Sequence, residues 1–141
     1  MPKIKVLAVK QPWASLIVEG LKTIEVRSRY TNIRGRVAIY ASTSKQETVE
    51  GEYGTDYNYR ILPTGQIIGT VEIFDCVDGE DINSLKFDAL RLLSLAPPKM
   101  ITNDAFYWRL ENPIKFTEPI PYKPPKGAVV WSNFDLPEEI Q

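Results

Sequence analysis

The feature that most constrains the fold is a change of hydrophobic period at Gly20. Before this glycine, apolar residues recur at helical spacing, and Pro12 fits the first position of a short helix over residues 12–19. After it, apolar and polar residues alternate over residues 23–28, which is typical of a strand. Because the residue that ends a helix often adopts the left-handed backbone conformation, which glycine reaches without strain, a glycine suits this junction. The sequence therefore predicts a helix that passes through a glycine turn into a strand.

Three charged residues lie at this junction and form the candidate site. Lys22 follows the glycine turn, and the alternation of the strand places Glu25 and Arg27 together on the face opposite its apolar residues. We expect the three side chains to converge on one cleft beside the helix. The alternative is a structural ion pair, and an exposed pair of that kind adds only about 0–1 kcal/mol to stability.

Basic residues are concentrated over residues 22–36, although the formal net charge of the chain is −1. A net charge near zero argues against a protein that coats a polyanion, whereas a local basic patch allows a focused phosphate or nucleic-acid site. A solvated basic face, balanced by acidic neighbours, is the alternative. Against the single acid Glu25, this segment carries Lys22, Arg27, Arg29, Arg34 and Arg36.

The residues that the chain lacks exclude several kinds of chemistry. It has no histidine and a single cysteine, Cys76, which removes Ser-His-Asp and Cys-His catalysis and leaves no ligand set for zinc. It also has no glycine-rich phosphate loop, so we expect neither a metal nor a cofactor. One cysteine fits a cytoplasmic protein, and the absence of a long apolar run predicts no membrane span.

The remaining pattern predicts an α+β protein. A chain of 141 residues is about one domain, so we expect a single domain over residues 1–141. Residues 43–65 are polar and tyrosine-rich, and 117–126 read as a proline-rich connection. Beyond the junction already described, we expect strands over 3–9, 36–41, 66–77, 105–111 and 127–132, and a helix over 85–95.

Several motifs in order resemble the ASCH domain family of the PUA-like superfamily. They are Gln11-Pro12-Trp13, then Gly20-x-Lys22-x-x-Glu25-x-Arg27, then the segments 34–42, 65–73, 107–113 and 126–131. The resemblance therefore spans almost the whole chain. It implies a small PUA-like β-barrel decorated by two or three helices, with a basic cleft between the first helix and the barrel.

The resemblance also implies an RNA-related binding module, whose partner is RNA, single-stranded nucleic acid or a nucleoside. Basic side chains would meet phosphates, Glu25 would accept a hydrogen bond from a base, and an aromatic ring would stack on that base. The tyrosine-rich residues 53–59 would cover the cleft. We expect the ligand-binding residues to be Lys22, Glu25, Arg27, Arg34, Arg36, Tyr40, Ser42 and Trp108.

An enzyme is the alternative. Some ASCH relatives resemble amidohydrolases that remove the acyl group of N4-acetylcytidine, and others resemble ribonucleases. Lys22 matches the amidohydrolase lysine, but Glu25 stands where that arrangement has a threonine. A lysine-based hydrolysis would use Lys22, with Glu25 as proton acceptor. The sequence favours binding over catalysis, and a third interpretation is an interaction domain of a transcription or translation complex.

Overall fold

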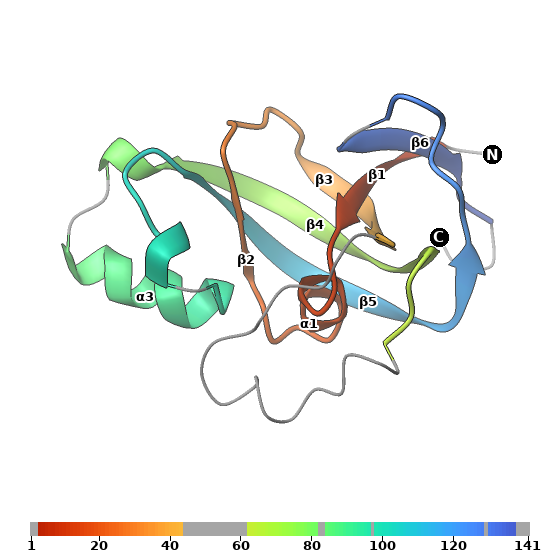
Figure 1. Ribbon diagram of the computed structural model, residues 1–141, viewed down its shortest axis with the longest axis horizontal. Coiled ribbons are helices and arrows are strands. Elements are labelled where there is room, and N and C mark those ends of the chain that lie inside the picture. Colours follow the sequence, from red (N-terminus) through yellow and green to blue (C-terminus); the bar gives the residue numbers. More distant parts are fainter. Residues whose placement is uncertain (1–2, 44–61, 82–83, 97, 129, 138–141) are drawn as a thin grey trace.

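Figure 1 shows the computed structural model of the chain, which describes residues 3–43, 62–81, 84–96, 98–128 and 130–137. The tyrosine-rich residues 53–59, for which a covering role is predicted, lie outside this part of the chain. Within it, no helix is both long and apolar enough to cross a membrane.

Six strands form one sheet in the order β2-β5-β4-β3-β1-β6. Strands β1 and β3 run parallel, and the other neighbours are antiparallel. Helix α1 lies in front of the sheet, and α3 lies at the end opposite β6 (Figure 1). The strands are β1 (Lys3–Val9), β2 (Ile24–Arg27), β3 (Gly35–Ala41), β4 (Gln66–Asp78), β5 (Phe106–Pro121) and β6 (Trp131–Asp135). The helices are α1 (Trp13–Val18) and α3 (Ser84–Ser94), with single 3-10 turns η2 (Gly79–Asp81) and η3 (Pro98–Met100).

The predicted α+β class is confirmed in its coarse form, a mostly β-sheet protein with two short helices. The predicted closed barrel is not confirmed. Among the described residues, β2 and β6 are the two ends of the strand order and do not pair with each other. Alternation predicts strands but not closure, because closure depends on how the two ends of a sheet meet.

Helix α1 is short and wholly buried. All six of its residues are buried, because it packs on the sheet and its neighbours enclose it. Gly20 ends it with φ of 81°, as the glycine turn predicts. The next backbone N–H groups, those of Leu21 and Lys22, both donate to the Leu16 carbonyl at 3.0 Å. The helix end therefore holds the backbone of Lys22 in place.

Strand β2 is covered on both faces, which alternation alone does not predict. Ile24 and the half-buried Val26 pack with Tyr107 in a cluster beside α3. Glu25 pairs with Trp108 of β5, whose indole belongs to the main core around α1. The carboxylate of Glu25 therefore faces the edge of the main core rather than solvent.

Two predicted boundaries are wrong. Strand β5 continues to Pro121, into the first half of the segment 117–126, which the sequence predicts as a connection. Strand β2 pairs only with residues 106–109 of β5. Among the described residues, the later part of β5 therefore has no neighbour on that edge, and its prolines break no ladder there. Strand β6 begins at Trp131 rather than at residue 127, because Gly127 lies in a turn with φ of 91°.

Gly69 allows α1 to approach β4 closely. A Cβ atom placed there would collide with the Ile114 carbonyl oxygen and lie 2.8 Å from Val18 Cγ1. We expect Gly69→Ala to lower the free energy of unfolding by about 3 kcal/mol, measured by urea denaturation. Gly35→Ala is the control, since a Cβ atom placed at Gly35 would have no atom of a non-neighbouring residue within 4 Å. Only the backbone φ of 96° opposes a side chain at this position. That variant should lose about 1 kcal/mol, and equal losses would contradict the packing argument.

Candidate functional site

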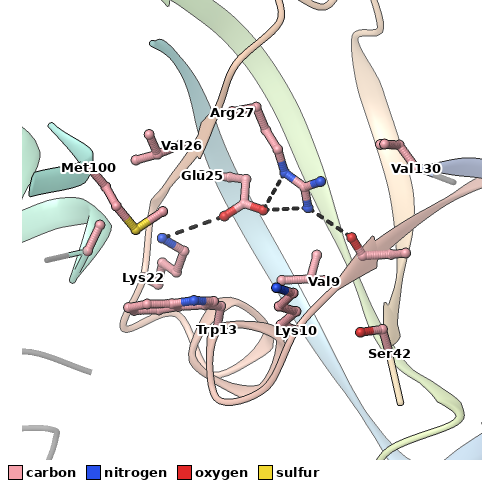
Figure 2. A pocket seen from close by; sticks show the side chains of 12 residues that line it. Val9, Lys10, Trp13, Lys22, Glu25, Val26, Arg27, Ser42, Met100 and Val130 are labelled. Atoms are coloured by element: carbon pink, nitrogen blue, oxygen red, sulfur yellow. Dashed lines mark hydrogen bonds and ion pairs between the residues drawn. The ribbon is translucent and has the colours of Figure 1, made fainter. Parts of the chain in front are cut away.

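A cavity of about 370 Å³ lies beside α1 and β2 (Figure 2). Its walls come from segments far apart in the sequence, including the end of β1, the residue after β3 and the turn η3. The lining residues are Ala8, Val9, Lys10, Trp13, Lys22, Glu25, Val26, Arg27, Ser42, Ala96, Met100 and Val130.

A buried carboxylate lies between the two cationic side chains with which it lines this cavity. Glu25 is 5% exposed, and Arg27 contacts its Oε2 atom through Nε at 2.8 Å and through a terminal nitrogen at 2.7 Å. The same terminal nitrogen donates to the Ala8 carbonyl oxygen at 2.8 Å. Because β1 and β2 are not neighbours in the sheet, Arg27 links two separate strands across the cavity (Figure 2).

Lys22 is the second cation of the cluster and is only 2% exposed. Its Nζ atom lies 3.6 Å from Glu25 Oε1 and 4.8 Å from the centre of the Trp13 ring. It also donates to the carbonyl oxygen of Ser94, the last residue of α3. A negative helix end, a carboxylate and an aromatic face therefore surround the ammonium group.

The environment moves both pKa values. Burial lowers the pKa of Lys22 from 10.5 to about 8, with Arg27 adding to the decrease and Glu25 opposing it. Burial by itself would raise the pKa of Glu25, but the charges of Arg27 and Lys22 outweigh it and hold that pKa below 4.5. At neutral pH Glu25 is therefore ionised, whereas Lys22 loses its proton near pH 8.

Of the predicted site residues, four line this cavity: Lys22, Glu25, Arg27 and Ser42. The two predicted arginines beyond β2 lie elsewhere. Arg34 is exposed and donates to the carbonyls of Thr31 and Ile33, and Arg36 pairs with Glu72 on β4. The basic run over residues 22–36 therefore does not gather at one place, because Arg34 lies in the loop before β3 and Arg36 on β3 faces Glu72 of β4.

The two predicted stacking residues also lie outside this cavity. Trp108 is 2% exposed, stacks on Trp131 with ring centres 5.8 Å apart, and donates its indole N–H to the Arg29 carbonyl. Tyr40 lines a neighbouring cavity. The aromatic ring that does line the charged cavity is Trp13, which the sequence analysis did not assign to the site.

Sequence reasoning also missed other lining residues, among them Lys10, Met100 and Val130. They come from three separate segments, and no local pattern links them. Among the described residues, no group of three histidine, cysteine or acidic residues is placed to hold a metal ion.

Comparisons with known proteins give a consistent family. Residues 7–120 match the family model of the ASCH domain. The human Activating signal cointegrator 1 is 39% identical over 82 residues, which cover 50% of this chain and 14% of the human protein. Its mouse counterpart is 38% identical over 82 residues with the same coverage. The match thus covers only a small part of these relatives.

Solved structures share the fold. The crystal structure of ASCH from Zymomonas mobilis has a TM-score of 0.60 and 18% identity, and the match covers 96% of this chain and 88% of that one. A mutant of the same protein has a TM-score of 0.60, with 98% of this chain and 93% of that one covered. At this level of identity, the likeness concerns the fold alone.

The lowered pKa of Lys22 predicts a pH-dependent stability. Between about pH 8 and pH 10.5 the unfolded chain binds more protons at Lys22 than the folded chain, so the free energy of unfolding rises with pH. Relative to Lys22→Met, the wild type should gain up to about 3 kcal/mol over this range, measured by urea denaturation. Lys115→Met, at an exposed position, controls for the loss of a lysine. If the difference in free energy of unfolding between wild type and Lys22→Met stayed constant with pH, the lowered pKa of Lys22 would be contradicted.

Proposed function

The chain belongs to the ASCH domain family, and on this basis we propose that its charged cavity binds one nucleobase, carried by a nucleoside or by an unpaired RNA nucleotide. The observation that carries the proposal is the buried Glu25 carboxylate beside the Lys22 ammonium group. A hydrogen-bond acceptor and a donor thus stand side by side in one cavity.

Both groups retain hydrogen-bonding capacity. Arg27 occupies Oε2 of Glu25, whereas Oε1 has only the longer contact of 3.6 Å with Lys22 Nζ, and a carboxylate oxygen can accept two hydrogen bonds. An ammonium group has three N–H donors, and one of those on Lys22 goes to Ser94. An N–H···carboxylate bond and an ammonium···nitrogen bond can therefore form together. The Watson–Crick edge of cytosine, with its N4 amino group next to N3, offers this pair of groups.

The size and walls of the cavity suit a single base. A volume of about 370 Å³ is near the lower end of the roughly 300–1,000 Å³ that is usual for small-molecule sites. The apolar side chains of Val9, Trp13 and Met100 line it and suit the faces of a planar ring. Among the charged residues that line the cavity, the cations Lys10, Lys22 and Arg27 outnumber the single acid Glu25.

The first functional prediction concerns base selectivity. Cytosine presents an N4 amino group where uracil has an oxygen, so the Glu25 carboxylate should favour cytidine over uridine by at least about tenfold. Glu25→Gln should abolish most of this preference, because an amide both donates and accepts hydrogen bonds. Isothermal titration calorimetry with the two nucleosides measures the ratio.

Glu72→Gln is the matched control, since Glu72 also pairs with an arginine but lies outside the cavity. This control should keep the wild-type preference, and circular dichroism checks that both variants fold. Equal binding of the two nucleosides by the wild type, or an unchanged preference in Glu25→Gln, would contradict the assigned role of Glu25.

One observation favours a second function, the hydrolysis of an acyl group from a modified base such as N4-acetylcytidine. The pKa of Lys22 is about 8, so about a tenth of the molecules hold a neutral amine at pH 7. That amine would take a proton from water as the water oxygen attacks the acyl carbon. The bond between the acyl carbon and N4 then breaks and N4 receives the proton from Lys22, which releases cytidine and acetic acid, and the acid loses its proton to solvent as acetate.

The lowered pKa of Glu25 changes the roles within this second function. A carboxylate with a pKa below 4.5 is a weak base, so Glu25 is less suited to the role of proton acceptor predicted for it. We assign proton transfer to Lys22, and Glu25 would orient the substrate and balance the charge of Lys22.

The second functional prediction separates binding from catalysis at Lys22. If the protein is a hydrolase, acetate release from N4-acetylcytidine should rise with pH through about 8. Lys22→Arg should then abolish turnover but keep nucleoside binding, because arginine cannot give up its proton. Lys115→Arg is the control at an exposed position. An enzymatic assay for acetate measures turnover. If Lys22→Arg released acetate at the wild-type rate, Lys22 would be excluded as the catalytic base.

A further inference from the structure

A second cavity, of about 230 Å³, lies next to the charged one. The two cavities share three lining residues, Ala8, Ser42 and Val130, so they meet along one common wall. The remaining residues that line the second cavity are Val6, Tyr40, Thr43, Pro124, Ala128, Trp131 and Ser132.

The two cavities differ in their chemistry. Lys10, Lys22, Glu25 and Arg27 line the first, whereas no charged side chain among the described residues lines the second. Apart from the indole of Trp131, the polar side chains that line the second cavity carry hydroxyls, from one tyrosine, one threonine and two serines. Because an ionised group buried without a partner is costly, this cavity disfavours a phosphate and suits a neutral group that carries hydroxyls.

Ser42 stands at the junction with an unsatisfied hydroxyl. Its Oγ atom is buried and has no hydrogen-bond partner among the residues that the structure describes. Its backbone N–H donates to the Val9 carbonyl at 2.9 Å, which fixes the position of the residue after β3. Figure 2 shows Ser42 at the side of the charged cavity away from Met100. Since buried polar atoms in folded proteins are normally paired, this hydroxyl is available to a polar group that enters the junction of the two cavities.

We propose that the two cavities form one nucleoside site. The base lies in the charged cavity against Glu25 and Lys22, the ribose lies in the second cavity, and Ser42 Oγ forms a hydrogen bond with a ribose hydroxyl where the cavities meet. The proposal rests on the proposed function, to which it adds that the sugar is recognised as well as the base.

The test compares cytidine with 1-methylcytosine, which has the same base edge and no ribose. Isothermal titration calorimetry should show that the wild type binds cytidine at least about tenfold more tightly. Ser42→Ala should lower the affinity for cytidine about tenfold and leave that for 1-methylcytosine unchanged. Ser28→Ala is the matched control, since Ser28 is exposed and lines neither cavity.

A second variant keeps the test decisive if Ser42→Ala folds poorly. Ala128 lines only the second of the two cavities, so the larger side chain of Ala128→Leu should fill that space. This variant should bind cytidine more weakly and bind 1-methylcytosine with unchanged affinity. Equal wild-type affinities for the two compounds, or cytidine binding that neither variant weakens, would overturn the ribose site while the base site stands. If neither compound binds the wild type, the proposed function itself fails.

Discussion

The structure depends on keeping one buried carboxylate charged. Glu25 lies at the edge of the main core, and an isolated carboxylate there would be strongly destabilising. Arg27 and Lys22 balance its charge, and each cation also donates to a carbonyl of another element, Ala8 in β1 or Ser94 in α3. The cluster therefore joins strands that are not neighbours in the sheet to the end of a helix. Apolar side chains in place of a buried ion cluster often give a core of equal stability. Stability alone therefore does not explain this cluster, and its position beside a cavity makes it a candidate functional site.

The scaffold holds these charges with little freedom. Helix α1 is wholly buried, and Gly69 brings it close to β4. Gly20 then turns the chain so that the backbone N–H of Lys22 donates to the Leu16 carbonyl. Two residues later, at Ile24, β2 begins to pair with β5. A site placed on elements fixed by packing and backbone hydrogen bonds is preorganised. This rigidity suits the recognition of a planar base edge, which requires a donor and an acceptor at a set spacing.

Much of the local structure could be predicted from the sequence. Three kinds of signal located most strands and both helices: the change of period at Gly20, the helical spacing or alternation of apolar residues in each segment, and the proline and glycine positions. These patterns are properties of neighbouring residues, so the sequence shows them directly. The grouping of Lys22, Glu25 and Arg27 also follows from local geometry, since a turn and one strand face bring them together. Boundaries failed where tertiary pairing decided them. Strand β5 runs on to Pro121 because its partner β4 is long and, within the described part of the chain, no strand on its other edge opposes its prolines.

By itself, the sequence determined the glycine turn, the charged triad, the absence of histidine chemistry and the resemblance to the ASCH family. Only the tertiary structure decided which of the other candidates reach the triad. Arg34 and Arg36 are near it in sequence but bond elsewhere, and Trp108 is buried against Trp131. Trp13, Met100 and Ser42 join the triad from separate elements. The physical reason is that burial, pKa and cavity walls depend on which segments become neighbours in space, and periodicity along the chain carries no information about those neighbours.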